Sequence, residues 1–127
     1  MPRYFRPHEA NALLPILHPL VREAMEIAER VQALQPELWA VIEKSVGNGG
    51  NPRLAQLVPD FERLHELLHQ IQAMGVEVKD ITVGLVDFPA WHEGRMVYLC
   101  WKYGESQVQF WHEVETGFAG RQPIDWD

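Results

Sequence analysis

GLVDFPAWHEGRMVYLCWKYGESQVQFWHEVETGFAGRQP, the stretch from Gly84 to Pro123, decides the fold of this chain. It is rich in the aromatic and β-branched residues that favour strands, and glycines punctuate it. Together with the residues just before it, it predicts three strands at 81–88, 95–103 and 107–113. A loop at 89–94 and a glycine-containing turn at 104–106 connect them. We therefore expect a small three-stranded antiparallel sheet.

The middle strand is apolar on both of its faces. Side chains alternate across a strand, so Val97, Leu99 and Trp101 share one face while Tyr98 and Cys100 point to the other. A sheet with one solvated face shows a clean polar face instead. Each face should therefore be covered, by helices on one side and by the C-terminal tail or a second subunit on the other.

Upstream of the sheet, two segments carry the apolar spacing of amphipathic helices. The first begins near Pro7, a residue suited to the first helical position. Its apolar residues alternate in steps of four and three, as in a heptad seam, at Leu13, Leu17, Leu20, Ala24, Ile27, Val31, Leu34, Leu38 and Val41. The second runs from about Arg53 to Met74 and continues the alternation at Leu54, Leu57, Phe61, Leu64, Leu68 and Ile71.

A loop rich in glycine and asparagine at 47–52 separates the two segments and predicts an antiparallel helical hairpin over about residues 7–74. Pro15, Pro19 and Pro36 should each kink or break the first helix. Because the apolar phase continues past Pro36, one kinked helix is favoured over two. The predicted fold class is α+β: a long helical hairpin, then a small sheet and an ordered tail over about 76–127, all in a single domain spanning 1–127.

Composition and charge narrow the class of protein. Hydrophobic residues make up 46% of the 127 residues and charged residues 23%, as in ordinary soluble domains. The formal net charge of −7 argues against binding to nucleic acid or to an anionic membrane, because both need a basic surface. A single cysteine fits a reducing cytosol, and neither a signal peptide nor a transmembrane run is visible. We expect a cytoplasmic protein.

One sequence pattern suggests a metal site on the second helix. His65, Glu66 and His69 match H-E-x-x-H, which places two imidazoles one helical turn apart, as in zinc proteases. However, Leu64 and Leu68 belong to the apolar seam, so both histidines lie toward the outer side of the hairpin. We interpret the three residues as ordinary surface residues and expect no metal there.

Polar residues near the strand ends form a second candidate site. Asp87, His112 and Glu113 offer two carboxylates and an imidazole, which could bind a divalent metal or perform acid–base chemistry. His112 and Glu113 are neighbours in a strand, so they point to opposite faces and cannot easily share one site. The alternative is that each side chain satisfies a local hydrogen bond or ion pair.

The tryptophans and the cysteine of the stretch have simpler interpretations. Trp101 and Trp111 could contribute to an aromatic ligand box, but such residues more often form a core or an interface. Cys100 lies in mid-strand among apolar neighbours and is expected to be buried and inert.

The tail Gly117–Pro123 carries two glycines and one strong cation, Arg121. Glycines allow the backbone to turn sharply, and a guanidinium suits a carboxylate. Two interpretations stay open. Arg121 either pairs with a buried carboxylate such as Asp87 and anchors the tail, or it binds an anionic ligand.

Several short motifs, taken together, resemble a known family. They are Glu9–Pro15 (EANALLP), Gly75–Asp80 (GVEVKD), Gly84–Ala90 (GLVDFPA), Leu99–Trp101 (LCW), Trp111–His112 and Gly117–Pro123 (GFAGRQP). Over nearly its whole length the chain resembles the bacterial family called Domain of Unknown Function 2203. The resemblance implies a small bacterial protein and supplies no catalytic residues.

These observations favour a homodimeric interaction or scaffold protein with no catalytic motif and no cofactor. The long helices and the aromatic sheet would provide the surface for a second subunit or for an unidentified protein partner. The residues expected on such a ligand or partner surface are Asp87, Trp101, Trp111, His112 and Arg121. The alternative is a metal- or anion-binding protein, or a small enzyme, with a site around Asp87, His112 and Arg121.

Overall fold

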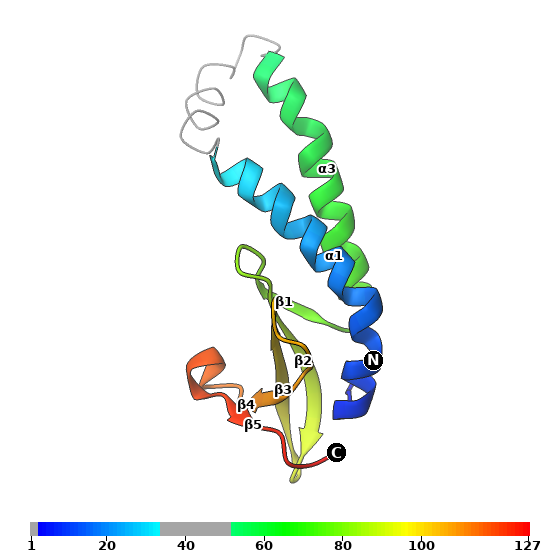
Figure 1. Cartoon of the computed structure of the whole chain (residues 1–127), viewed down its shortest axis with the longest axis vertical. Coiled ribbons are helices and arrows are strands. Elements are labelled where there is room, and N and C mark those ends of the chain that lie inside the picture. The colour runs from blue at the N-terminus through cyan, green and yellow to red at the C-terminus, as the bar shows by residue number, and fades with distance from the viewer. Residues whose placement is uncertain (1–2, 34–51) are drawn as a thin grey trace.

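The computed structural model describes residues 3–33 and 52–127, and for residues 52–57 it describes only the backbone. Two helices, α1 (Pro7–Ala33) and α3 (Pro52–Ala73), run antiparallel and extend as an arm beyond a small sheet (Figure 1). The sheet has five antiparallel strands in chain order: β1 (Glu77–Asp80), β2 (Leu85–His92), β3 (Arg95–Lys102), β4 (Phe110–His112) and β5 (Gln122–Pro123). A 3₁₀ helix, η1 (Gly117–Gly120), precedes the last strand. The α+β class is confirmed, and the two helices run antiparallel as the predicted hairpin requires, with their connection outside the described residues. The sheet has two more strands than expected.

The predicted strand at 81–88 is wrong in its bounds. Residues 81–84 form a turn, and β2 begins only at Leu85. Asp80 closes this turn, because its Oδ1 accepts hydrogen bonds from the Thr82 backbone N–H at 3.0 Å and from the Thr82 hydroxyl at 2.6 Å. Turns in which an aspartate side chain binds the backbone compete with strand pairing. The β-branched residues at 81–83 therefore predicted a strand where the chain forms a turn. The residues before the turn, Glu77–Asp80, pair with β2 as an unexpected edge strand.

The predicted loop at 89–94 is also wrong, since β2 continues through Pro89 to His92. Proline is tolerated in a strand where its missing N–H faces no partner strand. The pairing of β1 with β2 ends at Asp87, so Pro89 has no β1 partner. Its carbonyl accepts a hydrogen bond from the Phe5 backbone N–H at 2.7 Å instead. Glu93 and Gly94 then form a tight turn with positive φ angles.

Helix α1 is not broken at Pro15 or Pro19 but continues through both. Both prolines lie on the exposed side of the helix, so water can reach the carbonyls that they leave unpaired. The expected kink at Pro36, the seam residues beyond Val31 and the loop at 47–51 lie outside the described residues.

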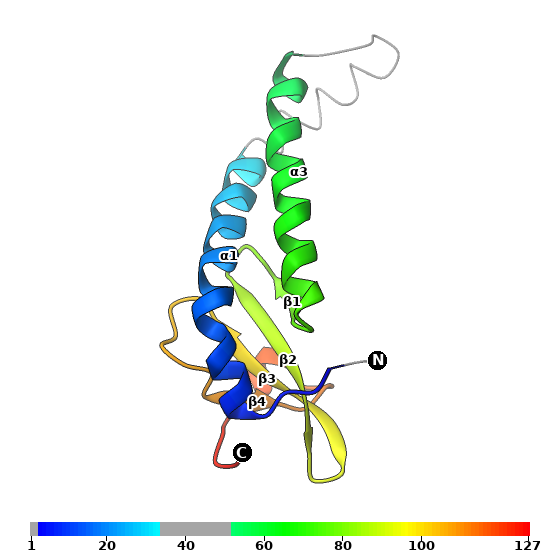
Figure 2. The same ribbon diagram turned by 90° about the vertical axis from the view of Figure 1, so that its right-hand side faces the viewer.

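One face of the sheet packs against the helices, and the main core lies there (Figure 2). Leu17 and Val21 of α1 are fully buried against alternate residues of β2 and β3. Those strand residues are Val86, Phe88, Val97, Leu99 and Trp101. The seam of the first helix is therefore confirmed over its described part.

The second helix keeps part of its expected seam: Ile71 is fully buried and Leu64 packs against a core cluster. Phe61 of the predicted seam is 39% exposed, and Leu67, which was not predicted, is the other fully buried residue among the described side chains of α3. Leu67 packs with Ala24 and Ile27 of α1 in a second, smaller cluster. Two ion pairs flank it, Arg63–Glu23 at 2.6 Å and Arg30–Asp60 at 3.0 Å. In the described part of the chain, neither helix is long and apolar enough to cross a membrane.

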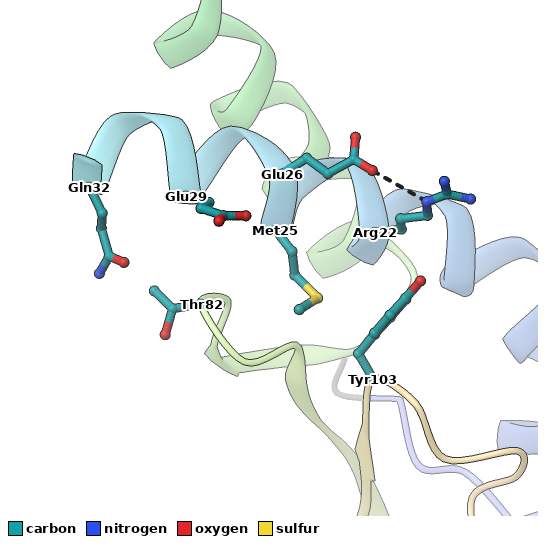
Figure 3. Close-up of a pocket in the computed structure, with 7 residues that line it drawn as sticks. All are labelled: Arg22, Met25, Glu26, Glu29, Gln32, Thr82 and Tyr103. Carbon is teal, nitrogen blue, oxygen red and sulfur yellow. Dashed lines mark hydrogen bonds and ion pairs between the residues drawn. The ribbon is translucent and has the colours of Figure 1, made fainter. Parts of the chain in front are cut away.

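The turn before β2 depends on a crowded glycine. Gly84 has a φ angle of +68°, and a Cβ atom there would lie 2.5 Å from the Tyr103 Cβ and 2.7 Å from the Met25 Sδ. Figure 3 shows Met25 and Tyr103 converging between α1 and this turn. Gly117 has a similar φ angle of +60° with open space around it.

We predict that Gly84→Ala destabilises the fold more than Gly117→Ala. Both variants should lose about 1–2 kcal/mol from backbone strain at positive φ, and Gly84→Ala should lose roughly 1–3 kcal/mol more from overpacking. Urea unfolding of both variants and the parent measures the difference. Equal losses would contradict this account of the turn.

Candidate metal centre

Three neighbouring strands bring a carboxylate, a thiol and an imidazole together. Asp87 of β2 pairs with Cys100 of β3, and Phe110 of β4 pairs with Cys100 from the other side. His112 lies two residues beyond Phe110, so its side chain shares the face of Asp87 and Cys100. One potential ligand atom from each of the three residues lies within 4.8 Å of the others. Among the described residues this is the one such group of three.

All three side chains are withdrawn from water. Cys100 is fully buried, Asp87 is 2% exposed and His112 is 3% exposed. The His112 Nε2 lies 2.9 Å from the Asp87 Oδ2, and the His112 Nδ1 lies 2.7 Å from the Glu113 carbonyl oxygen. A carbonyl can only accept, so Nδ1 carries a hydrogen and donates it. This bond fixes the ring so that Nε2 faces the carboxylate.

The second carboxylate oxygen, Asp87 Oδ1, is buried and has no hydrogen-bond partner among the described residues. Leaving a buried acceptor unsatisfied costs about 1–3 kcal/mol, so such atoms are uncommon in folded proteins. Burial raises the pKa of Asp87, and the nearby His112 opposes that rise. Burial, reinforced by the Asp87 charge, raises the pKa of the Cys100 thiol to about 12. The cluster therefore holds its thiol proton tightly at neutral pH.

On the side facing β1, the cluster of Asp87, Cys100 and His112 is bordered by Tyr98. The Tyr98 hydroxyl donates to the Glu77 carboxylate at 3.1–3.2 Å, and the Tyr98 and His112 rings lie 5.5 Å apart. Lys79 Nζ lies 2.8 Å from Glu77 Oε1 and 4.5 Å from the centre of the Tyr98 ring. These residues form one boundary of the site.

On the opposite side lies Arg121, whose partner was predicted wrongly. The sequence suggested a pair with Asp87, but Asp87 binds His112, and the Arg121 Nη2 lies 2.5 Å from Glu105 Oε2. The guanidinium stacks between the Phe110 ring at 4.1 Å and the Phe118 ring at 4.7 Å. Glu105 sits in the β3–β4 connection, where its other oxygen accepts the Lys102 N–H. Of the two interpretations, the one in which Arg121 anchors the tail by pairing with a carboxylate agrees with the structure. The carboxylate is that of Glu105 and not that of Asp87.

The expected surface of five residues is split between the two faces of the sheet. Trp101 and Trp111 belong to the core beneath the helices, and Trp101 Nε1 donates to the Glu105 carbonyl at 2.9 Å. Asp87 and His112 lie on the opposite face. Glu113 points away from His112, as expected, and makes two hydrogen bonds to Arg95. Cys100, interpreted as inert, is the residue that sequence reasoning left out of the site.

The H-E-x-x-H residues show no sign of a metal centre. His65, Glu66 and His69 are all exposed on α3, as expected. Glu66 forms a 3.2 Å ion pair with Arg63. Within the part of the chain that the structure describes, no third ligand gathers with them.

A surface cavity of about 240 Å³ lies on the helix side of the sheet, between α1 and the turn at Thr82 (Figure 3). It is lined by Arg22, Met25, Glu26, Glu29, Gln32, Thr82 and Tyr103. An Arg22–Glu26 ion pair at 3.3 Å occupies one wall. We interpret the cavity as a packing gap between the arm and the sheet.

A family model described as "Uncharacterized conserved protein (DUF2203)" matches residues 3–124, so the chain belongs to that family. Neither the curated proteins nor the solved structures contain a match to the chain.

We predict strong coupling between Arg121 and Glu105, whose side chains are 12% and 20% exposed. Each of Arg121→Ala and Glu105→Ala should cost roughly 2–4 kcal/mol, because it strands a mostly buried charge. The double variant should cost clearly less than the sum of the two.

A double-mutant cycle by urea unfolding measures this coupling. The exposed pair Arg22–Glu26, with side chains 66% and 55% exposed, is the matched control and should show coupling below about 0.5 kcal/mol. Equal coupling energies in the two cycles would contradict the anchoring role of Arg121.

Proposed function

We propose that this member of the DUF2203 family binds a divalent transition-metal cation, preferably Zn²⁺, through Asp87, Cys100 and His112. The observation that carries the proposal is the convergence of three different donor atoms within 4.8 Å in a buried position. The buried Asp87 Oδ1 adds a second argument, because a bound cation would give that oxygen a partner. The Cys100 thiol, which interacts with the Asp87 carboxylate, would release its proton to bind the same cation.

The donor set selects the class of cation. Zinc is bound in proteins by thiolate, imidazole and carboxylate, whereas Ca²⁺ and Mg²⁺ prefer oxygen ligands alone. Zinc is bound tetrahedrally with bonds of about 2.0–2.3 Å, so two of its donor atoms lie roughly 3.3–3.8 Å apart. The three donor atoms here lie within 4.8 Å of one another, so binding would draw the side chains closer together.

Charge balance also supports a doubly charged cation. An ionised Asp87 and a Cys100 thiolate together carry two negative charges, which a divalent cation neutralises. A buried site without net charge avoids the large cost of placing an unpaired charge in the interior. Because the pKa of the Cys100 thiol is about 12, the cation must displace a proton, and binding should weaken as the pH falls.

The surroundings of His112 resemble those of metal-bound histidines in general. Such histidines usually donate their second ring N–H to a carbonyl or carboxylate, which orients the ring toward the metal. Here the His112 Nδ1 donates to the Glu113 carbonyl. The three donors come from β2, β3 and β4, so a cation would cross-link the sheet. Three protein donors match the zinc sites in which a water is the fourth ligand, whereas structural zinc takes four protein ligands. The burial of all three donors keeps that fourth position away from bulk water in the observed conformation.

We predict one equivalent of bound Zn²⁺ per chain after chelator treatment and reloading, with a rise in the free energy of unfolding. Cobalt substitution should add a sulfur-to-metal charge-transfer band, because Cys100 is the only cysteine. Cys100→Ser should abolish the band, and His112→Ala should abolish stoichiometric binding.

The control is the double variant His65→Ala/His69→Ala, which should keep the bound metal and stay within about 1 kcal/mol of the parent stability, as surface substitutions do. Loss of metal in this control, or a parent chain that takes up none, would refute the proposal.

A second candidate function, homodimeric interaction, is favoured by an exposed aromatic pair. Tyr4 and Trp91 are 43% and 58% exposed and meet edge to face, with ring centres 5.7 Å apart. Exposed tryptophan is enriched at protein interfaces, where it commonly dominates the binding energy. We propose that this pair contributes to contact with a second copy of the chain.

Light scattering at micromolar concentration should then give about twice 14.7 kDa. Trp91→Ala should return the mass to that of one chain, while Phe61→Ala, which removes an exposed aromatic from the arm, should leave the dimer intact. A parent protein that scatters as a single chain would exclude this candidate.

A further inference from the structure

Access to the buried cluster requires part of the structure to move. Its three side chains are at most 3% exposed, so neither a cation nor a reagent reaches them in the observed conformation. The helix side offers no path, because fully buried residues of α1, β2 and β3 fill it. On the other side the Tyr98 ring, which is 8% exposed, lies beside His112, and the Glu77 carboxylate holds its hydroxyl in place.

The segment from residue 113 to 121 lies on the surface of the molecule. It connects β4 to β5, and its helical turn η1 contains no buried residue. Phe118, its largest apolar side chain, is 44% exposed. Segments with few buried contacts open locally at a lower free-energy cost than the whole domain.

This segment lies over the part of the sheet that holds Cys100. Arg121 stacks on Phe110, the residue that pairs with Cys100 across β3 and β4. Lys102, two residues beyond Cys100 on the same face, places its Nζ 5.6 Å from the centre of the Phe118 ring. The charge of Arg121 also acts on the thiol, where it opposes the rise in pKa that burial causes.

The Arg121–Glu105 ion pair ties the C-terminal end of this segment to the β3–β4 connection. Its Nη2–Oε2 distance is 2.5 Å and both side chains are mostly buried. Among the described residues, Arg121 Nε is buried without a partner, and the hydrogen bond of the guanidinium goes to Glu105. At the other end of the segment, Glu113 is held by the sheet: its carboxylate accepts from Arg95 of β3 at 2.5 and 2.8 Å, and its carbonyl accepts from His112 Nδ1 at 2.7 Å. Between these two ends, the described hydrogen bonds, such as Thr116 N to the Glu113 carbonyl, are internal to the segment.

We infer that residues 113–121 form a lid over Asp87, Cys100 and His112, held shut by the Arg121–Glu105 ion pair, and that release of this pair opens the path to the three side chains. The role of this lid in admitting a cation rests on the proposed function. The local opening that exposes Cys100 does not depend on that function.

The test is the rate at which Cys100 reacts with the disulfide reagent DTNB. Cys100 is the only cysteine, so the signal has one source. Glu105→Gln removes the charge from the ion pair and should raise the rate by about tenfold or more, as expected when a charge-assisted hydrogen bond is lost. Glu23→Gln makes the same change in the more exposed Arg63–Glu23 pair on the helices, away from the segment, and should change the rate by no more than about twofold.

The urea dependence of the rate separates local from global opening. In the parent, labelling at low urea should be nearly independent of urea, because lid opening exposes little surface. The lid would be refuted if, in both the parent and Glu105→Gln, the labelling rate rose with urea as steeply as global unfolding does.

Zinc uptake distinguishes the failure of the lid from the failure of the proposed function. If Zn²⁺ binds and Glu105→Gln speeds neither its uptake nor DTNB labelling, the lid is wrong and the metal site stands. If the parent takes up no Zn²⁺ but Glu105→Gln speeds labelling, the metal site is wrong and the lid stands.

Discussion

The register that pairs β2, β3 and β4 is the constraint on which the rest of the structure depends. It sends Val97, Leu99 and Trp101 to the helix side, where they form the core with α1. The same alternation places Cys100 on the other face, between Asp87 and the strand that carries His112. A slip of one residue would move the apolar set to the wrong face and separate the three polar groups. The core and the candidate metal centre therefore depend on the same pairing.

The strongest features of the fold were predictable from local patterns. The apolar spacing between Leu13 and Val31 indicated the face of α1 that packs, because helical periodicity follows directly from the backbone. The predicted strand 95–103 nearly matches β3. The hypothesis that the tail covers the second face of the sheet is supported by the contacts of Arg121 and Phe118.

The predictions from sequence were wrong where a residue that is distant along the chain but close in space determines the local structure. Pro89 lies inside a strand because its carbonyl binds Phe5 and β1 ends before it, and neither fact is visible in the residues around it. The partner of Arg121 is Glu105 because a turn carries that carboxylate to the tail. Cys100 was interpreted as inert because its burial was foreseen, whereas the two polar side chains beside it appear only once the register is known. Alternation alone could have placed Asp87, Cys100 and His112 on one face if the correct pairing had been assumed.

A buried carboxylate, thiol and imidazole with an unsatisfied oxygen lower the stability of the sheet unless a ligand compensates for them, and the central claim is that a cation does so. X-ray absorption spectroscopy at the zinc edge of the reloaded protein tests this claim most directly. The account predicts a first coordination shell with one sulfur, together with the scattering pattern of one imidazole. A shell of nitrogen and oxygen alone, with no sulfur, would contradict it.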